Sequence, residues 1–178
     1  MTIDSRRTPD ARGRAAVISE GAAVKLVRAA SLVFTGLFSG FLLGVLVLEN
    51  SLRAYGGTVY TQVRHVELDS LDKLASATLI PALVCTALVA VLTIRARGND
   101  RWFVLVALAL LVLVFVTSLT VNLPINGDQV DWSVQAPPAD WASVRDRWQL
   151  AHVVRTFSAV VAFCSLTVGL ISAARRRP

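Results

Sequence analysis

One predicted helical face near the C-terminal end of the chain places charged and aromatic side chains in an apolar environment. At spacings of 3, 4 and 3 residues, this face carries Arg145, Trp148, His152 and Arg155. An arginine at the middle of a membrane-crossing helix costs about 2.5–3.5 kcal/mol on insertion scales. We therefore expect Arg155 to face the interior of a helix bundle or a wet cavity, with snorkelling towards the surface as the competing interpretation. Trp148 also fits an aromatic belt at a membrane interface.

Two amide side chains lie at the end of the preceding apolar stretch, in the segment Asn122-Leu-Pro-Ile-Asn126. Pro124 removes a backbone donor and favours an extended conformation at Leu123, so the helix is expected to end here. The pair Asn126-Gly127 would then form a turn. The two asparagines either cap freed carbonyl groups or face a cavity, because irregular backbone at membrane depth is tolerated only against protein or water.

The segment 60–72 predicts a second helical face that carries Gln62, His65, Asp69 and Asp72. A histidine and an aspartate four residues apart can chelate a metal ion, but they also form ordinary surface pairs. The chain has only two histidines. A metal site would therefore combine ligand types suited to iron or copper, namely His65, Asp69, His152 and Glu49. No two-histidine motif demands a metal, so iron, copper and no cofactor all stay open.

Four apolar stretches must position these side chains: residues 26–48, 74–94, 102–121 and 150–174. A helix needs about 20 mostly apolar residues to cross a bilayer. The chain of 178 residues is 54% hydrophobic and only 17% charged, below the share of about 25% in soluble domains. We predict an all-α bundle of four transmembrane helices over residues 26–174, preceded by a disordered basic cytoplasmic tail over residues 1–25.

Basic residues are concentrated in the segments that an even number of spans places on one side of the membrane. The N-terminal tail, the loop around residues 95–101 and the C-terminus hold twelve of the eighteen Lys and Arg, whereas the other two loops hold eight of the twelve acidic residues. The positive-inside rule then predicts a multi-pass protein of the plasma (inner) membrane with both termini in the cytoplasm. Bases scattered between apolar runs exclude a nucleic-acid binder. The expected partners are membrane lipid and a hydrophobic small molecule.

Small residues in the first span predict close helix packing. Gly36, Gly40 and Gly44 form a ridge that lets another helix approach. We expect this ridge to pack within the bundle, with a homodimer interface as the alternative. Cys85 and Cys164 both lie inside spans, where we expect them to act as small packing residues.

The sequence resembles the anthrone oxygenase-like family, a group of small four-helix membrane proteins of which many have no known function. The resemblance rests on the Asn-x-Pro-x-Asn pattern of Asn122–Asn126 at the end of the third span. It also rests on the Trp-x3-His-x2-Arg-Thr pattern of Trp148–Thr156 at the start of the fourth span, and it covers roughly residues 26–174. Gly127 and Ala151 depart from the family pattern, which often has an Asn and an aromatic residue there.

The resemblance implies oxygenase chemistry, and we expect it to act on a lipophilic aromatic or quinone-like substrate at the outer membrane face. Family members in fungal polyketide pathways are taken to oxidise anthrones to anthraquinones with molecular oxygen. His152 would be the base that removes a proton from the substrate. The resulting enolate oxygen would be stabilised by Arg155, Asn122 and Asn126. Trp148 and Arg145 would bind the substrate. A metal held by His65 and His152 would instead bind oxygen.

A non-catalytic role is the alternative to an enzyme. The polar face of the last span would then hold the bundle together or bind a partner, as in an accessory subunit or a small-molecule carrier. Four spans without a detectable repeat are few for an alternating-access carrier, which would need a dimer.

Overall fold

All regular secondary structure in the described part of the chain is helical. The computed structural model describes the backbone of residues 11–175 and the side chains of residues 21–175. Its elements, in chain order, are α1 (Ala11–Ser51), η1 (Leu52–Ala54), α2 (Gly57–Arg95), α3 (Arg101–Thr117), η2 (Ser118–Asn122), α4 (Leu123–Val130) and α5 (Trp141–Ala174).

Four helical stretches are long and apolar enough to cross a membrane: Gly21–Ala54, Gly57–Arg95, Arg101–Val130 and Trp141–Ala174. This confirms the predicted all-α fold with four membrane-crossing helices, and the protein is a multi-pass membrane protein. The helices are longer than the apolar stretches read from the sequence. The 39 residues of α2 extend over about 58 Å at 1.5 Å per residue, against a hydrocarbon core of about 30 Å. The extra turns therefore carry polar side chains beyond the purely apolar segments.

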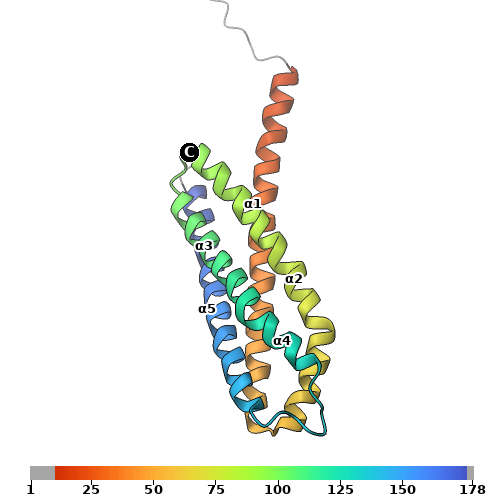
Figure 1. The fold of residues 1–178 in the computed structure, drawn as a ribbon. Helices are drawn as coiled ribbons and strands as arrows, with labels where there is room; N and C mark the ends of the chain where they lie inside the picture. The colour runs from red at the N-terminus through yellow and green to blue at the C-terminus, as the bar shows by residue number, and fades with distance from the viewer. Residues whose placement is uncertain (1–10, 176–178) are drawn as a thin grey trace, which may run out of the picture.

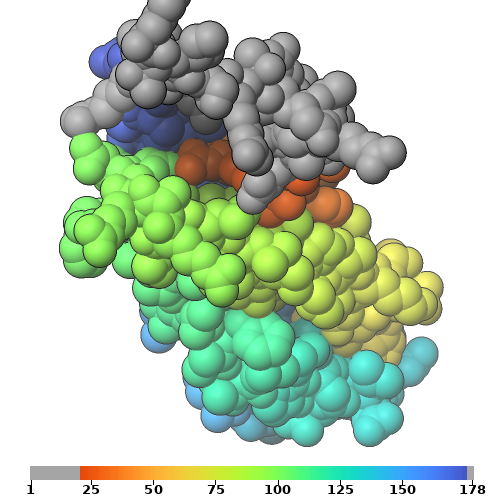
Figure 2. Space-filling view, turned by 90° about the horizontal axis from the view of Figure 1, so that it is seen from above, coloured from red at the N-terminus to blue at the C-terminus, as the bar shows by residue number. Residues whose placement is uncertain are grey.

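The helices pack in a ring in which α1 contacts α2 and α5, and α3 also contacts α2 and α5. Both ends of the described chain lie at the same end of the bundle, together with the short link between α2 and α3 (Figure 1). The connections from α1 to α2 and from α4 to α5 lie at the opposite end. From above, the surfaces of α2 and of α3 with α4 lie side by side (Figure 2).

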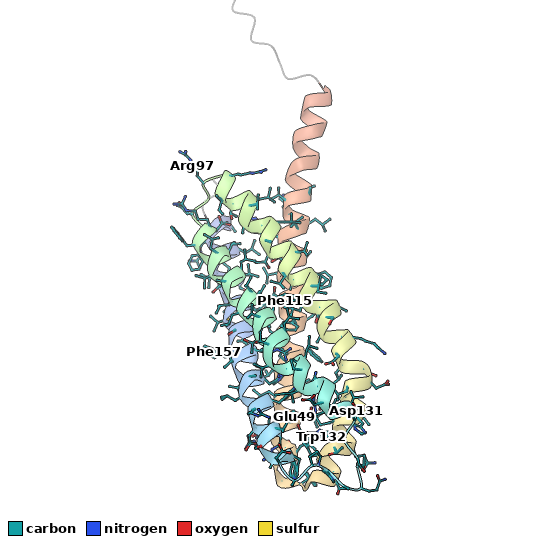
Figure 3. All side chains as sticks on the ribbon, in the orientation of Figure 1. Glu49, Arg97, Phe115, Asp131, Trp132 and Phe157 are labelled. Atoms are coloured by element: carbon teal, nitrogen blue, oxygen red, sulfur yellow. The ribbon has the colours of Figure 1, made fainter. Side chains whose placement is uncertain are left out.

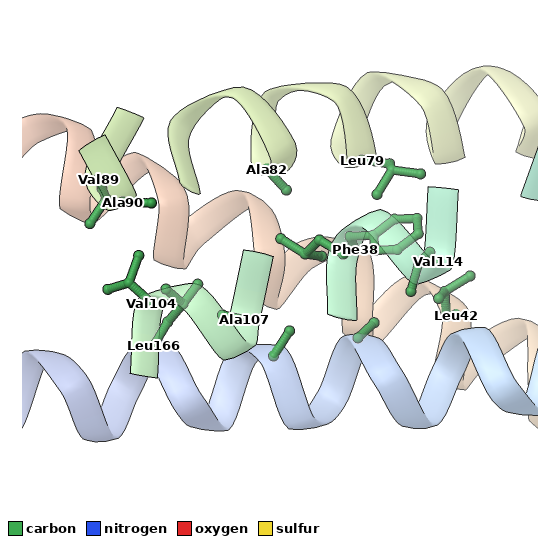
Figure 4. Close-up of a cluster of buried hydrophobic side chains, with 13 residues drawn as sticks. Phe38, Leu42, Leu79, Ala82, Val89, Ala90, Val104, Ala107, Val114 and Leu166 are labelled. Carbon is green, nitrogen blue, oxygen red and sulfur yellow. The ribbon is translucent and has the colours of Figure 1, made fainter. Parts of the chain in front are cut away.

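The centre of the bundle is a core of buried apolar side chains drawn from all four long helices (Figure 4). Phe38 from α1 is fully buried among Leu79 and Val114 from its neighbours. Small residues, among them Ala82 and Ala107, are also fully buried and let the helix backbones approach one another. Because lipid offers little hydrophobic driving force between helices, this close packing is the main source of attraction in the core.

Helix α1 begins earlier than the predicted boundary between tail and membrane domain. It starts at Ala11 and includes residues 11–25, and its first turns extend past the end of the bundle (Figure 1). The segment 11–25 contains five alanines and no proline, so nothing in it stops a helix that the span has already nucleated. Residues 1–10 of the predicted tail lie outside the described residues.

The helix end predicted at Pro124 is wrong. The chain passes from α3 through the π-turn η2 directly into α4, and the N–H of Leu123 donates to the carbonyl of Ser118, five residues back. Pro124 sits at the start of α4. The wide turn absorbs the missing backbone donor and relieves the clash of the proline ring with the preceding turn. The third membrane-crossing helix therefore continues to Val130.

Only one of the three ridge glycines packs inside the bundle. A Cβ added to Gly36 would lie 3.0 Å from the ring of Phe163 in α5, whereas no atom lies within 4 Å of a Cβ at Gly40 or Gly44. We predict that Gly36→Leu lowers the free energy of unfolding by about 1–3 kcal/mol, because an overpacked side chain must displace Phe163. Gly40→Leu is the matched control and should stay within about 0.5 kcal/mol of wild type. Thermal melts in detergent measure both, and equal melting temperatures would contradict the assignment.

Candidate functional site

One guanidinium group organises the polar end of the bundle. Arg64 on α2 is only 2% exposed. Its Nη1 donates to Oε1 of Glu49 over 3.1 Å and to Oε2 of Glu67 over 2.5 Å. Its Nε donates to Oε1 of Gln129 over 3.0 Å, and its Nη2 donates to Oδ1 of Asn126 over 2.8 Å. A single buried arginine thus joins α1, α2 and α4.

Further hydrogen bonds extend this network to the fourth long helix. Gln149 of α5 donates to both the carbonyl and the Oε2 of Glu49, over 2.9 and 3.0 Å. Gln129 donates to the hydroxyl of Tyr60 over 3.1 Å. Figure 3 places Glu49 and Trp132 at the end of the bundle opposite Arg97. The Arg64 network therefore joins α1, α2, α4 and α5, one element from each of the four membrane-crossing stretches, at one end of the molecule.

His152 and Trp148 form a buried stack one turn apart on α5. Their ring centroids lie 4.8 Å apart with an interplanar angle of 7°. The indole Nε1 of Trp148 donates to Oδ1 of Asn126 over 2.6 Å, and the Arg64 guanidinium lies 4.4 Å from the Trp148 ring centroid. Indole and guanidinium thus make a cation–π contact. Trp148 is a fixed wall of the site, held from two other helices.

The contacts of His152 define which ring nitrogen carries its proton. Its Nε2 lies 2.9 Å from the carbonyl oxygen of Leu42, and the residue is 2% exposed. A carbonyl oxygen only accepts, so Nε2 is the donor and Nδ1 keeps a free lone pair in the neutral ring. Nδ1 is buried and has no hydrogen-bond partner among the described residues. A histidine held in this way is suited to accept a proton from a ligand.

Arg155 differs from Arg64 in having no partner. It is 7% exposed, and its buried Nε makes no hydrogen bond within the described part of the chain. No carboxylate of the described residues lies within 4.0 Å of its guanidinium. Buried polar atoms are normally paired, so an orphaned one points to a bound water or ligand. Among the described residues, other buried atoms without a partner at this end are Oδ1 of Asn122, Oε1 of Glu67 and Oγ1 of Thr61.

Two cavities meet at Arg155. The smaller measures about 30 Å³ and is lined by residues that include His152, Glu67 and Trp148. It has room for one or two water molecules. The larger measures about 240 Å³ and opens between α2 and the run from α3 to α4. Residues common to both linings are Asp72, Ala75, Asn126 and Arg155.

Most of the residues expected to act together do share these cavities. His152, Trp148, Asn126 and Arg155 line the smaller one, and Asn122, Asn126 and Arg155 line the larger one. Arg145 lines neither. It lies ten residues before Arg155, about 15 Å along the helix. There it stacks on Trp141 at 4.9 Å and pairs with Asp146 at 3.1 Å.

The four predicted metal ligands are not brought together. Among the described residues, no three His, Cys, Asp or Glu side chains are placed to hold a metal ion. Glu49 is held by Arg64, while His65 lies 3.2 Å from the Gln129 carbonyl and shares a surface groove with Asp69. His65 follows Arg64 directly, so it points about 100° around the helix from the cavity side of α2. Within the described residues these four side chains therefore do not form a donor set for iron or copper.

Sequence reasoning missed the residues at the centre of the network, above all Arg64 and Glu67. A signal for them exists, because Tyr60, Arg64, Glu67 and Leu71 follow at helical spacings of 4, 3 and 4 and form a face separate from that of His65. The neighbouring face carries His65 and Asp69, which are common metal-binding residue types, and the metal prediction was based on that face. Gln129 and Gln149 carry no such signal, because their partners lie 65 and 100 residues away in the sequence.

Comparison with known families gives a match over part of this chain. Residues 72–165, more than half of the sequence, match the family model described as Anthrone oxygenase. The matched segment contains Asp72, both asparagines of α3–α4 and the cavity face of α5, whereas Glu49 and Arg64 precede it. Neither the curated proteins nor the solved structures give a match. The family match, together with the four apolar helices and the residues gathered at their polar end, shows that the chain belongs to the anthrone oxygenase family.

Proposed function

We propose that the protein is a membrane oxygenase that converts an acidic methylene group of a lipophilic aromatic or quinone-like molecule to a carbonyl group with molecular oxygen. One observation carries the proposal: His152 and Arg155 line the same cavity, and Nδ1 of His152 and Nε of Arg155 are both buried without a hydrogen-bond partner among the described residues. A free base beside a free cation suits a reaction that removes a proton and creates an oxyanion. The family membership of the chain supports the same chemistry.

The first step is proton abstraction. Nδ1 of His152 takes one proton from the methylene carbon through a water molecule in the smaller cavity, and the electron pair of that C–H bond moves onto the carbonyl oxygen to form an enolate. Arg155 donates to this oxygen, and Asn122 lies on the same cavity wall. In a buried site these donors stabilise the negative charge more strongly than water does.

The second step uses molecular oxygen as the oxidant. The enolate carbon bonds to one oxygen atom, and the imidazolium of His152 returns its proton to the distal oxygen, which yields a hydroperoxide. Loss of the second hydrogen on carbon and cleavage of the O–O bond leave a new carbonyl group and one water molecule. One molecule of oxygen is consumed for each methylene oxidised. The smaller cavity has room for the water that is released.

We further propose that both termini lie in the cytoplasm of the plasma (inner) membrane, so that the site belongs to the outer half of the bilayer. The supporting observation is the separation of charge. Arg97 lies at the end of the bundle that holds both described termini, and Glu49 and Asp131 lie at the other end (Figure 3). Basic segments are retained on the cytoplasmic side.

The test is oxygen uptake by purified protein in nanodiscs with anthrone as substrate, above the rate of protein-free nanodiscs. His152→Ala should lower the rate about 100-fold, the contribution of a positioned general base. His65→Ala is the matched control, because His65 lines neither cavity at Arg155. A wild-type rate equal to the protein-free rate would overturn the proposal, as would an undiminished rate in a folded His152→Ala variant.

A non-catalytic role for the polar end is favoured by one observation. The Arg64 network uses Asn126 and contacts Trp148, so part of the predicted site already acts in joining the helices. In that case Asn126→Leu would weaken the bundle without any effect on chemistry. The network does not account for Arg155 or for Nδ1 of His152, which stay unpartnered among the described residues.

A further inference from the structure

The larger cavity faces the membrane. Four large apolar side chains at its rim are between 38% and 53% exposed, namely Ile80, Phe115, Leu119 and Leu123. They belong to membrane-crossing helices, so the exposed surface of these residues meets lipid tails. Phe115 lies on α3 between the level of Arg97 and that of Glu49 (Figure 3). The larger cavity is therefore a groove that opens sideways into the bilayer, between the two ends of the bundle, and it is called the groove from here on.

The inner wall of the same groove is polar and contains unsatisfied groups. Arg155 is more than nine-tenths buried, and its Nε has no partner among the described residues. Oδ1 of Asn122 is likewise unpartnered, although its Nδ2 donates to the carbonyl of Trp148 over 3.3 Å. An apolar channel that ends on a free guanidinium is complementary to an apolar molecule with a negative oxygen.

One carboxylate also lines the inner wall and would repel such an oxygen. Asp72 accepts from Nδ2 of Asn126 with both of its oxygens, over 3.0 and 3.1 Å. Its lone pairs are thus directed to the amide of α4, and the free donors of Arg155 stay available. The anionic oxygen is expected to bind Arg155 on the side away from Asp72.

The size of the groove limits its occupant. Its volume of about 240 Å³ is below the range of about 300–1,000 Å³ of pockets for drug-sized ligands. The adjoining cavity of about 30 Å³ has room only for water-sized molecules. A compact organic molecule reaches Arg155 through the groove, with His152 beyond it.

We propose that this groove is the binding site for a compact, apolar molecule that enters from the bilayer between α2 and α3–α4 and pairs with Arg155 through one oxygen, which is anionic in the bound enolate. The inference rests on the proposed function and deepens it, since it names the path of the substrate and the charge that the bound molecule presents to Arg155. Because a phospholipid headgroup also presents an anionic oxygen, the test must separate lipid from substrate.

The test measures how tightly anthraquinone-2-carboxylate, a probe without an oxidisable methylene, binds to the protein in phosphatidylcholine nanodiscs. Quenching of tryptophan fluorescence reports the binding. Neutral 2-methylanthraquinone is the comparison. Wild type should bind the carboxylate at least about tenfold more tightly, as one charge-assisted hydrogen bond provides. Arg155→Gln should remove this preference.

Two bulky substitutions test the path. Ser76 lines the groove, whereas its exposed neighbour Ala77 does not. Ser76→Trp should weaken binding of the carboxylate about tenfold or more, while Ala77→Trp should leave it unchanged. Leu119→Trp blocks the same groove from α3–α4 and serves if Ser76→Trp does not fold.

Several results would overturn the proposal. One is equal affinity for the charged and neutral probes. A second is unchanged probe binding in folded Ser76→Trp and Leu119→Trp variants. A third is loss of probe binding in phosphatidylglycerol nanodiscs, which would assign the groove to lipid headgroups.

Oxygen uptake separates the two proposals. Probe binding as expected without anthrone turnover removes the oxygenase and keeps the groove. Full turnover in Ser76→Trp keeps the oxygenase and removes the groove.

Discussion

Arg155→Gln is expected to make the protein more stable and far less active. The guanidinium is buried without a hydrogen-bond partner among the described residues, and the nearby Asp72, which lines the same cavities, does not form a direct ion pair with it, so its desolvation is only partly compensated. Glutamine keeps a planar polar group on a shorter side chain and removes the charge. We expect the free energy of unfolding to rise by roughly 1–2 kcal/mol. Oxygen uptake with anthrone should fall by about 100- to 1,000-fold, the loss typical of a missing oxyanion donor.

The control for this prediction is Arg145→Gln on the same helix. Arg145 lies against Trp141 and the exposed Asp146, where ion pairs contribute about 0–1 kcal/mol. Neither its melting temperature nor its turnover should change appreciably. Thermal melts and oxygen uptake on the same nanodisc preparations give both quantities. A less stable Arg155→Gln variant would mean that Arg155 supports the fold, and the argument for a ligand at its guanidinium would fail.

The cavity face of α5 illustrates what one sequence can predict. Trp148, His152 and Arg155 lie on one continuous helix, so their spacing alone places them together. The apolar segments around them are long enough that only membrane-crossing helices satisfy their backbone. The structure confirms the membrane-crossing helices. It places all three residues on the lining of the smaller cavity, as expected for residues on one face of a single helix.

The predictions that the structure contradicts depend on contacts between different helices. The effect of Pro124 was predicted from its local chemistry, but Asn122 before it is held by the Trp148 carbonyl of α5, and the chain continues through a π-turn. The metal hypothesis grouped His65 with His152 because both lie at the same end of the bundle. The sequence does not reveal how α2 is rotated about its own axis, and this rotation directs His65 to the backbone of α4.

Arg64 is the residue whose loss should damage the fold most. Arg64→Met leaves Glu49, which is fully buried, and Glu67, which is 5% exposed, without their shared cation. Breaking a buried ion pair from one side costs about 3–5 kcal/mol. The same substitution also removes the hydrogen bonds that Arg64 donates to Asn126 and Gln129. We expect a loss of that size in the free energy of unfolding, measured by thermal melts or by titration with denaturing detergent.

A compensating variant shows that charge, rather than packing, causes this loss. If Glu49→Gln and Glu67→Gln are added to Arg64→Met, no uncompensated charge stays buried and most of the stability should return, because complete replacement of a buried ionic group is often neutral. Arg53→Met is the surface control, since both members of its pair with Asp146 are about half exposed, and its effect should stay below about 1 kcal/mol. If the triple variant is no more stable than Arg64→Met, the Arg64 side chain holds the helices by shape. The network would then position Asn126 and Trp148 beside the cavity through packing alone.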